Sequence, residues 1–278
     1  MKQRANGSTW LWRAISVSAL TATCLLLFGF AYAASDLLFP SVPPAVQTDS
    51  EQEQGGGSAE LTGQDEIRIV AIGDSLTRGT GDVTGEGYVK QVVDGLSAKL
   101  DKPVQLINNL AVNGLRADEL ADKLESERGM HLAVEQANVI LLTIGGNDLF
   151  QFAQGAVFEE QQAESMNRNE ISHRLSEGVQ RLERVFELLH ELNPEAKVVY
   201  VGLYNPFYDL QQLREGSLQV QEWNNYAYRA AYEYPNITVV PTFDLFESTI
   251  GTYLSRDHFH PNHEGYTQIA ARIIQVLQ

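Results

Sequence analysis

Cysteine and basic residues are scarce in this 278-residue sequence, and each scarcity excludes a class of protein. The one cysteine, Cys24, excludes an intramolecular disulfide, and its place within an apolar stretch argues against a catalytic thiol. Only 20 lysine and arginine residues stand against 36 aspartate and glutamate residues, which gives a formal net charge of −16. Such a surface repels the phosphates of nucleic acids, so we expect no nucleic-acid partner.

Long apolar runs are also missing, with one exception near the N-terminus. Residues 14–34 carry no charge and follow three basic residues, Lys2, Arg4 and Arg13. As a helix rising about 1.5 Å per residue, this run just crosses a hydrocarbon layer of about 30 Å, with the basic residues left in the cytoplasm. The sequence therefore predicts that residues 1–34 are a membrane anchor or a signal peptide.

Two features of this run favour different fates. Ala31-Tyr32-Ala33 has the small-residue pattern that signal peptidase cuts, and cleavage after Ala33 would give a secreted protein. The length of the run, with Trp10 and Trp12 at its edge, is typical of a retained anchor. Whether the run is cleaved or retained, the rest of the chain is exported. We therefore expect that part in the medium, or attached to the membrane and facing outside.

The chain after this run divides into a spacer and a folded domain. Residues 35–65 are rich in proline, acidic residues and glycine and have few apolar side chains, which predicts a disordered linker. Residues 66–278 carry regular apolar patterns and no internal repeat, which predicts one globular domain of ordinary size.

Short β-branched runs alternate with helical patterns throughout this domain. We expect strands buried on both faces at residues 67–72, 104–108, 139–144, 197–203 and 237–240. We expect helices at residues 88–100, 117–126, 170–192, 217–234 and 264–277. This alternation predicts an α/β fold, a three-layer α/β/α sandwich around a parallel sheet.

Polar segments follow several of these strands, and a parallel sheet places its ligand site beyond the carboxyl ends of its strands. They are Gly73-Asp74-Ser75, residues 109–114, Gly145-Gly146-Asn147-Asp148, and the stretch "SRDHFHPNHEGY" before the last helix. Together they contain the parts of a serine hydrolase: a hydroxyl on Ser75, an imidazole on His260 and an orienting acid, Asp257. Oxyanion donors would be the backbone N–H groups of Ser75 and Gly114 and the side chain of Asn147.

At these four blocks the sequence resembles the GDSL-type SGNH hydrolases, across essentially all of residues 66–278. The resemblance implies a flavodoxin-like, five-stranded, mainly parallel sheet and an enzyme that forms an acyl-enzyme. It also assigns the nucleophile to Ser75 and the base and acid to His260 and Asp257. The oxyanion hole would be Ser75, Gly114 and Asn147, and no metal or organic cofactor would be required.

The expected activity is hydrolysis of an ester or thioester, in a lipid, a lysophospholipid or a small acyl ester. An alternative with the same residues is deacetylation of a cell-wall or extracellular carbohydrate. A shallow polar cleft would favour the carbohydrate, whereas a deep apolar pocket would favour a lipid. A second alternative is a non-catalytic surface module that retains the fold.

Several other features have competing interpretations. His258, His260 and His263 lie close enough in sequence to suggest a metal site, although we expect His263 to be a surface residue near the start of the last helix. The glycine-rich residues 79–87 lack the Gly-Lys-Ser/Thr ending of a phosphate loop, so we expect a flexible rim of the site.

Three further segments are predicted to surround the site or to support it. Residues 149–169 are expected to form a mobile rim or partial lid. The aromatic segments 204–210 and 223–234 are candidates for an acyl pocket, although helix packing explains the second equally well. Asp74 and Asp148 are expected to be structural, with Asp148 ordering its neighbouring loop.

Overall fold

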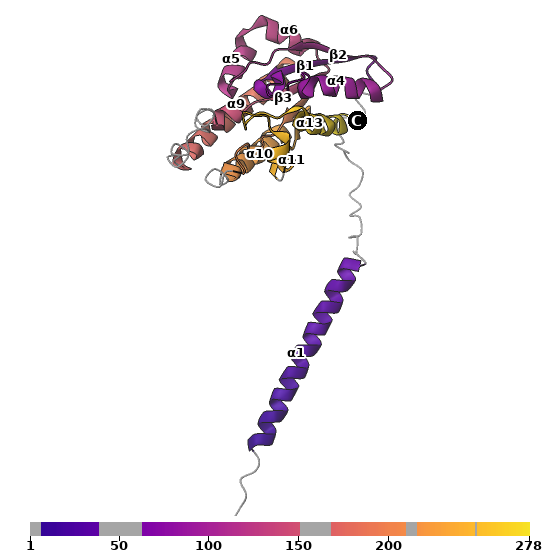
Figure 1. Ribbon diagram of the computed structural model, residues 1–278, viewed down its shortest axis with the longest axis vertical. Coiled ribbons are helices and arrows are strands. Elements are labelled where there is room, and N and C mark those ends of the chain that lie inside the picture. The colour runs from indigo at the N-terminus through magenta and orange to yellow at the C-terminus, as the bar shows by residue number, and fades with distance from the viewer. Residues whose placement is uncertain (1–6, 39–62, 151–167, 210–215, 248) are drawn as a thin grey trace, which may run out of the picture. The chain divides into compact units, whose positions relative to one another are not determined.

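The computed structural model describes residues 7–38, 63–150, 168–209, 216–247 and 249–278 (Figure 1). The chain divides into two compact units, residues 1–53 and residues 54–278. The expected lid, residues 149–169, lies for the most part outside the described residues. The same is true of the expected linker, residues 35–65.

The described part of the first unit is one helix, α1 (Gly7–Leu38). Its segment Trp12–Phe30 is long and apolar enough to cross a membrane. The two threonine hydroxyls of this segment donate to the helix backbone, Thr21 to Val17 O and Thr23 to Ala19 O, both at 2.9 Å. Such internal hydrogen bonds satisfy polar groups that an apolar environment would leave without a partner.

The second unit is built on a five-stranded sheet in which every pairing is parallel. The strand order is β2-β1-β3-β4-β5, which agrees with the expected flavodoxin-like sheet. The strands are β1 (Ile67–Gly73), β2 (Val104–Asn109), β3 (Val139–Thr143), β4 (Lys197–Val201) and β5 (Ile237–Val240). Gly73 of β1 is in register with Thr143 of β3, so the two strands end level with each other at the same edge.

Helices cover both faces of the sheet, because alternate strand residues point to opposite sides. Val70 and Ile72 of β1 pack in the core beneath α5 (Ala117–Ser126), α6 (Arg128–Gln136), α9 (Arg168–Leu192) and α10 (Gly216–Tyr232). Ile69 and Ala71 pack in the core beneath α4 (Gly87–Lys99), α11 (Phe243–Glu247), α12 (Ile250–Tyr253) and α13 (His263–Val276). The expected three-layer sandwich is confirmed.

One expectation about burial is wrong. The strand at residues 104–108 was expected to be buried on both faces, but β2 is half-buried at Val104 and exposed from Gln105 to Asn109. It is the edge strand next to β1, and its sequence VQLINN carries polar residues that a central strand would bury without partners. The four other strands have the expected burial, apart from half-buried Arg68 and Thr238.

Among the described residues of this unit, five short helices have no counterpart in the sequence-based expectations. They are α3 (Ser75–Arg78), α6, α7 (Gly146–Phe150), α11 and α12. Helices of four to nine residues show only one or two apolar repeats, so their periodicity is too brief to recognise. Two of them, α3 and α7, begin directly after strands and contribute residues to the candidate site.

Candidate active site

The segments that follow the strands meet at one edge of the sheet, as parallel topology requires. The N–H of Asp74 donates to Thr143 O at 3.0 Å, which joins the segment after β1 to the end of β3. The N–H of Val112 donates to Gly73 O at 2.9 Å, which joins the segment after β2 to the same point. Ser75 therefore lies between the loops that were expected to surround it.

Ser75 is the first residue of α3 and is 4% exposed. Gly73, at the turn before it, has a φ of +127°, and a Cβ there would lie 1.9 Å from Thr143 O. Only glycine fits this close approach of two backbones. Asp74 caps α3 by accepting a hydrogen bond from Leu76 N at 3.0 Å, and its carboxylate also accepts from Thr143 Oγ1 of β3 at 2.6 Å. Burial raises the pKa of Asp74, and these hydrogen bonds offset part of that effect.

Ser75, His260 and Asp257 form a continuous chain of polar contacts. The Nε2 of His260 lies 2.8 Å from Ser75 Oγ, and its Nδ1 lies 2.7 Å from Asp257 Oδ2. An ionised carboxylate only accepts hydrogen bonds, so Asp257 places the imidazole proton on Nδ1. The Nε2 lone pair is thereby directed at the serine hydroxyl.

Asp257 is held as an ionised carboxylate by four donors. Its Oδ1 accepts from Ser255 Oγ at 2.7 Å, from His260 N at 2.9 Å and from Phe259 N at 3.0 Å, and its Oδ2 receives the imidazole. Partial burial raises the pKa of Asp257, but the hydrogen bonds from His260 and its neighbours outweigh burial and lower that pKa to about 2. The group is therefore ionised across the neutral range.

The loop that carries His260 is fixed at several points. Leu254 and Pro261 form an isolated antiparallel bridge, and Ser255 N donates to His260 O at 2.8 Å. The buried hydroxyl of Tyr204 donates to Phe259 O at 2.6 Å. These contacts fix the backbone of the loop on both sides of the imidazole.

Asn147 and Ser75 both line one cavity at this edge of the sheet. Asn147 lies in the first turn of α7, is 2% exposed, and donates through Nδ2 to Leu115 O at 2.9 Å. Gly114 has a φ of +79°, a backbone conformation that favours glycine, and it directly precedes Leu115. Gly114 is not among the described residues that line the cavity, and the carbonyl that Asn147 contacts belongs to the next residue, Leu115.

The rest of the described cavity wall is largely apolar. Its apolar members include Phe150, Val201, Leu203, Tyr204, Pro206 and Phe259. Three of them lie in or next to the aromatic segment 204–210, so that candidate for an acyl pocket does face Ser75. The second aromatic segment packs differently, because Trp223 is buried in the core and donates to Tyr200 Oη at 2.8 Å.

The loop at residues 79–87 is tied together by Asp82, whose importance the sequence analysis missed. Its carboxylate accepts from Thr84 N and Oγ1, both at 2.8 Å, and from Gly87 N at 2.9 Å. His263 Nδ1 lies 3.2 Å from the same carboxylate. The loop expected to be a flexible rim is therefore held by a buried acid. An aspartate in a glycine-rich turn was the available signal.

The three histidines near the C-terminus have different surroundings. His260 contacts Asp257, His263 contacts Asp82, and His258 is exposed with a φ of +52°. Asn262 caps α13 by accepting from Gly265 N at 2.9 Å, which agrees with the expected helix start. Over the described ranges, no group of three or more His, Cys, Asp or Glu side chains is arranged to hold a metal ion.

Two curated proteins resemble this chain along most of their length. Uncharacterized protein YpmR of Bacillus subtilis is 34% identical over 90% of this chain and 95% of its own. Spore germination lipase LipC of Bacillus licheniformis is 28% identical over 74% of this chain and 94% of its own.

Solved structures with the same fold include esterases and lipases. The lipase Lip_vut3 from a goat rumen metagenome has a TM-score of 0.65 and 25% identity, over 76% of this chain and 97% of that chain. Axe2, an acetylxylan esterase from Geobacillus stearothermophilus, has a TM-score of 0.54 and 18% identity, over 76% and 94%.

The family comparison covers the region in which the site lies. The model of the GDSL-like Lipase/Acylhydrolase family matches residues 71–268, a range that contains Ser75, Asn147 and the loop from Asp257 to His260. The α/β sheet, the residues gathered at its edge and this match agree, and the chain therefore belongs to the GDSL-like lipase/acylhydrolase family.

Proposed function

We propose that this protein is a serine esterase that cleaves acyl esters through an acyl-enzyme formed on Ser75. The observation that carries the proposal is the chain of contacts from Ser75 Oγ to His260 Nε2 at 2.8 Å and from His260 Nδ1 to Asp257 Oδ2 at 2.7 Å. Nucleophile, base and orienting acid in this order are the requirement for serine acyl transfer.

The reaction begins when His260 Nε2 takes the proton of Ser75 as Oγ bonds to the ester carbonyl carbon. The resulting imidazolium is stabilised by Asp257, whose lowered pKa keeps it anionic. The tetrahedral intermediate collapses, the bond to the alcohol oxygen breaks, and His260 returns the proton to that oxygen. Water then attacks the acyl-enzyme with His260 again as base, and Ser75 is regenerated.

The oxyanion of both tetrahedral intermediates would be bound by the N–H groups of Ser75 and Gly114 and by the side-chain amide of Asn147. Asn147 supports this role because it lines the same cavity as Ser75 and its amide is oriented by Leu115 O at 2.9 Å. Donors fixed in advance stabilise developing charge without having to reorganise during the reaction.

The substrate class that fits the described cavity is an ester with an apolar acyl group. Phe150, Leu203 and Phe259 offer the acyl chain a largely hydrocarbon surface next to Ser75. This lining favours a lipid or another acyl ester over an acetylated carbohydrate, whose acetyl group would use little of the cavity. Two of the similar proteins are named as lipases, which supports this choice, whereas Axe2 is named as an acetylxylan esterase.

We also propose that the enzyme acts outside the cytoplasmic membrane, attached through its N-terminal helix. The length of α1 and its apolar segment Trp12–Phe30 support an anchor. If residues 1–34 are retained, the protein will be found in the membrane fraction at full length. Cleavage after Ala33 would instead release a shortened protein into the medium.

The decisive experiment is labelling of the full-length protein with a fluorophosphonate, followed by mass mapping of the modified peptide. The proposal requires an adduct on Ser75 that is lost in Ser75→Ala and strongly slowed in His260→Ala. Exposed Ser97 provides the control, because Ser97→Ala should label like the wild type. A folded protein that forms no adduct would support the non-catalytic module instead.

A further inference from the structure

Asp148 is a buried carboxylate beside Asn147 that the proposed reaction does not use. Its side chain has 0% exposure, and among the described residues no donor forms a hydrogen bond to its Oδ1. Burial raises the pKa of Asp148 to about 6, although the hydrogen bond from Ala117 N works in the opposite direction. Burying a carboxylate lowers the free energy of unfolding unless hydrogen bonds or opposite charges compensate for the lost hydration. The partners of Asp148 therefore show what its burial achieves.

The Oδ2 of Asp148 accepts a hydrogen bond from the backbone N–H of Ala117 at 3.0 Å. Ala117 is the first residue of α5, where backbone N–H groups have no partner within the helix. A negative charge at this position is also favoured by the helix dipole. Asp148 therefore stabilises the start of α5 together with Glu119, whose side chain accepts from Arg116 N at 3.0 Å.

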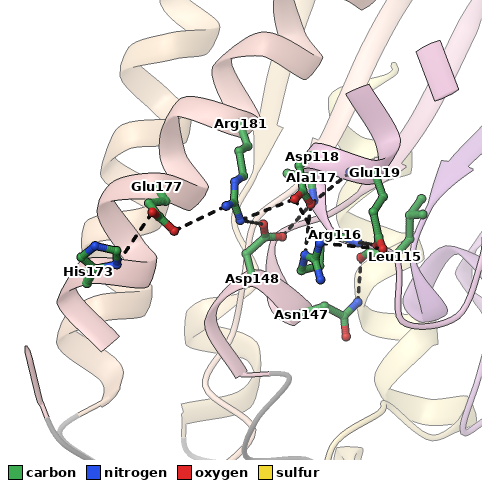
Figure 2. A network of polar contacts seen from close by, with 10 residues as sticks. All are labelled: Leu115, Arg116, Ala117, Asp118, Glu119, Asn147, Asp148, His173, Glu177 and Arg181. Carbon is green, nitrogen blue, oxygen red and sulfur yellow. Dashed lines mark hydrogen bonds and ion pairs between the residues drawn. The ribbon is translucent and has the colours of Figure 1, made fainter. Parts of the chain in front are cut away.

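Asn147, the residue before Asp148, binds the same segment at a different backbone atom. Asn147 donates to Leu115 O, and Asp148 accepts from Ala117 N, two residues further on (Figure 2). Two consecutive residues of α7 are therefore hydrogen-bonded to one short stretch of backbone. That stretch begins immediately after Gly114.

Arg181 of α9 supplies the positive charge that faces Asp148 (Figure 2). Its Nη1 lies 3.6 Å from Asp148 Oδ1 and 3.9 Å from Asp118 Oδ2. Arg116 pairs with Asp118 at 3.0 Å and also contributes positive charge near Asp148. Arg181 is thereby placed to keep the carboxylate directed between α9 and α5.

We propose that Asp148 is a positioning residue for the oxyanion hole, because it holds the segment bearing Gly114 against the helix bearing Asn147. The inference rests on the proposed function, in which these two residues donate to the oxyanion. Asp148 itself touches no substrate. Its contribution is to keep two donors, which arise on separate loops, at a fixed spacing.

The test compares Asp148→Ala with Asp148→Asn in the full-length protein, using p-nitrophenyl acetate as substrate. Turnover is expressed per active site counted by complete fluorophosphonate labelling. We expect Asp148→Ala to lower kcat about tenfold or more while KM changes less than about twofold, because oxyanion donors act on the transition state. Asp148→Asn retains an oxygen that can accept from Ala117 N, and should recover most of the lost kcat.

A second readout reports the oxyanion directly. A short-chain trifluoromethyl ketone forms a tetrahedral oxyanion adduct with an active serine, so its inhibition constant should rise by the same factor as kcat falls. Glu187→Gln is the matched control, because it removes an acid from an ion pair of the same helix α9, with Arg184 at 2.6 Å, and Glu187 is not among the described partners of Asp148 or of the Gly114 segment. It should leave both measurements unchanged.

The proposal is overturned if Asp148→Ala turns over and binds the ketone like the wild type. It is also overturned if the loss lies wholly in KM, or if Asp148→Asn is as impaired as Asp148→Ala. Should Asp148→Ala fail to fold, Asp148→Ser takes its place, since its hydroxyl is too short to reach the same N–H. A wild type that does not label on Ser75 would refute the proposed function instead.

Discussion

The Nε2 of His260 lies 2.8 Å from Ser75 Oγ although the two residues are 185 positions apart in the sequence. Ser75 is set by the tight turn after β1, and His260 by the bridged loop before α13.

Replacing the orienting acid should lower turnover without weakening substrate binding. In Asp257→Asn the side chain keeps its size but loses the charge that holds the imidazole proton on Nδ1. We expect kcat for p-nitrophenyl acetate to fall roughly 10³- to 10⁴-fold with little change in KM. Asp244→Asn, which removes another exposed acid in a charge pair, is the control and should leave kcat unchanged. Near wild-type turnover in Asp257→Asn would remove Asp257 from the mechanism.

Replacing Asp148 by asparagine should change how the free energy of unfolding depends on pH. The pKa of Asp148 is raised to about 6 in the folded protein, so its stabilising contribution is present below pH 3.8 and is lost as pH rises through 6. The full difference corresponds to roughly 3 kcal/mol. Between pH 4 and pH 7, the free energy of unfolding of Asp148→Asn should therefore rise relative to the wild type, as measured by urea denaturation.

Asp118 provides a control of opposite sign for that experiment. Burial raises its pKa, but hydrogen bonding to Arg116 and the charge of Arg181 prevail and lower the pKa overall. Its stabilising contribution is therefore present above pH 3.8 and lost as pH falls. Asp118→Asn should lose stability relative to the wild type as pH rises toward about 4 and should then follow the wild type up to pH 7, so a rise like that of Asp148→Asn would contradict the assignment.

Enlarging the cavity should shift the acyl preference toward longer chains. Leu203 lines the cavity and is 6% exposed, so Leu203→Ala opens space beside Ser75. Each methylene newly buried is worth about 0.8 kcal/mol, which is roughly a fourfold gain in kcat/KM. We expect the ratio of kcat/KM for p-nitrophenyl octanoate over acetate to rise.

The matched variant for this comparison is Leu188→Ala. Leu188 is 5% exposed and lies in the same core but does not line the cavity. Both variants should lose about 2 to 5 kcal/mol of stability. Only Leu203→Ala should change the octanoate-to-acetate ratio, and an equal shift in both would show that the cavity does not hold the acyl chain.

Removing the acid that ties the loop at residues 79–87 should destabilise the fold. Asp82→Ala leaves the N–H groups of Thr84 and Gly87 without their acceptor, at a cost of about 1 to 3 kcal/mol in urea denaturation. Burial raises the pKa of Asp82, but these hydrogen bonds prevail and lower it, so the loss should shrink as pH falls below 3.8. The exposed acid Asp94 is the control, because Asp94→Ala should change stability little.

The sequence alone determined the strand positions and the fold class, because hydrophobic periodicity records which faces of an element are buried. Residues 237–240 were expected as a strand and form β5, and residues 117–126 were expected as a helix and form α5. The segments that carry Ser75, Asn147 and His260 were also recognisable, since each follows a strand or precedes the last helix.

Tertiary structure decided the properties that depend on partners distant in the sequence. The exposure of β2 follows from its place at the sheet edge, which its own residues do not specify. The hydrogen bond between Asp148 and Ala117 joins residues 31 positions apart, and the contact of Asp82 with His263 joins residues 181 positions apart. Local sequence patterns report local geometry and burial, whereas these carboxylates acquire their roles only when packing excludes water and brings one particular donor within reach.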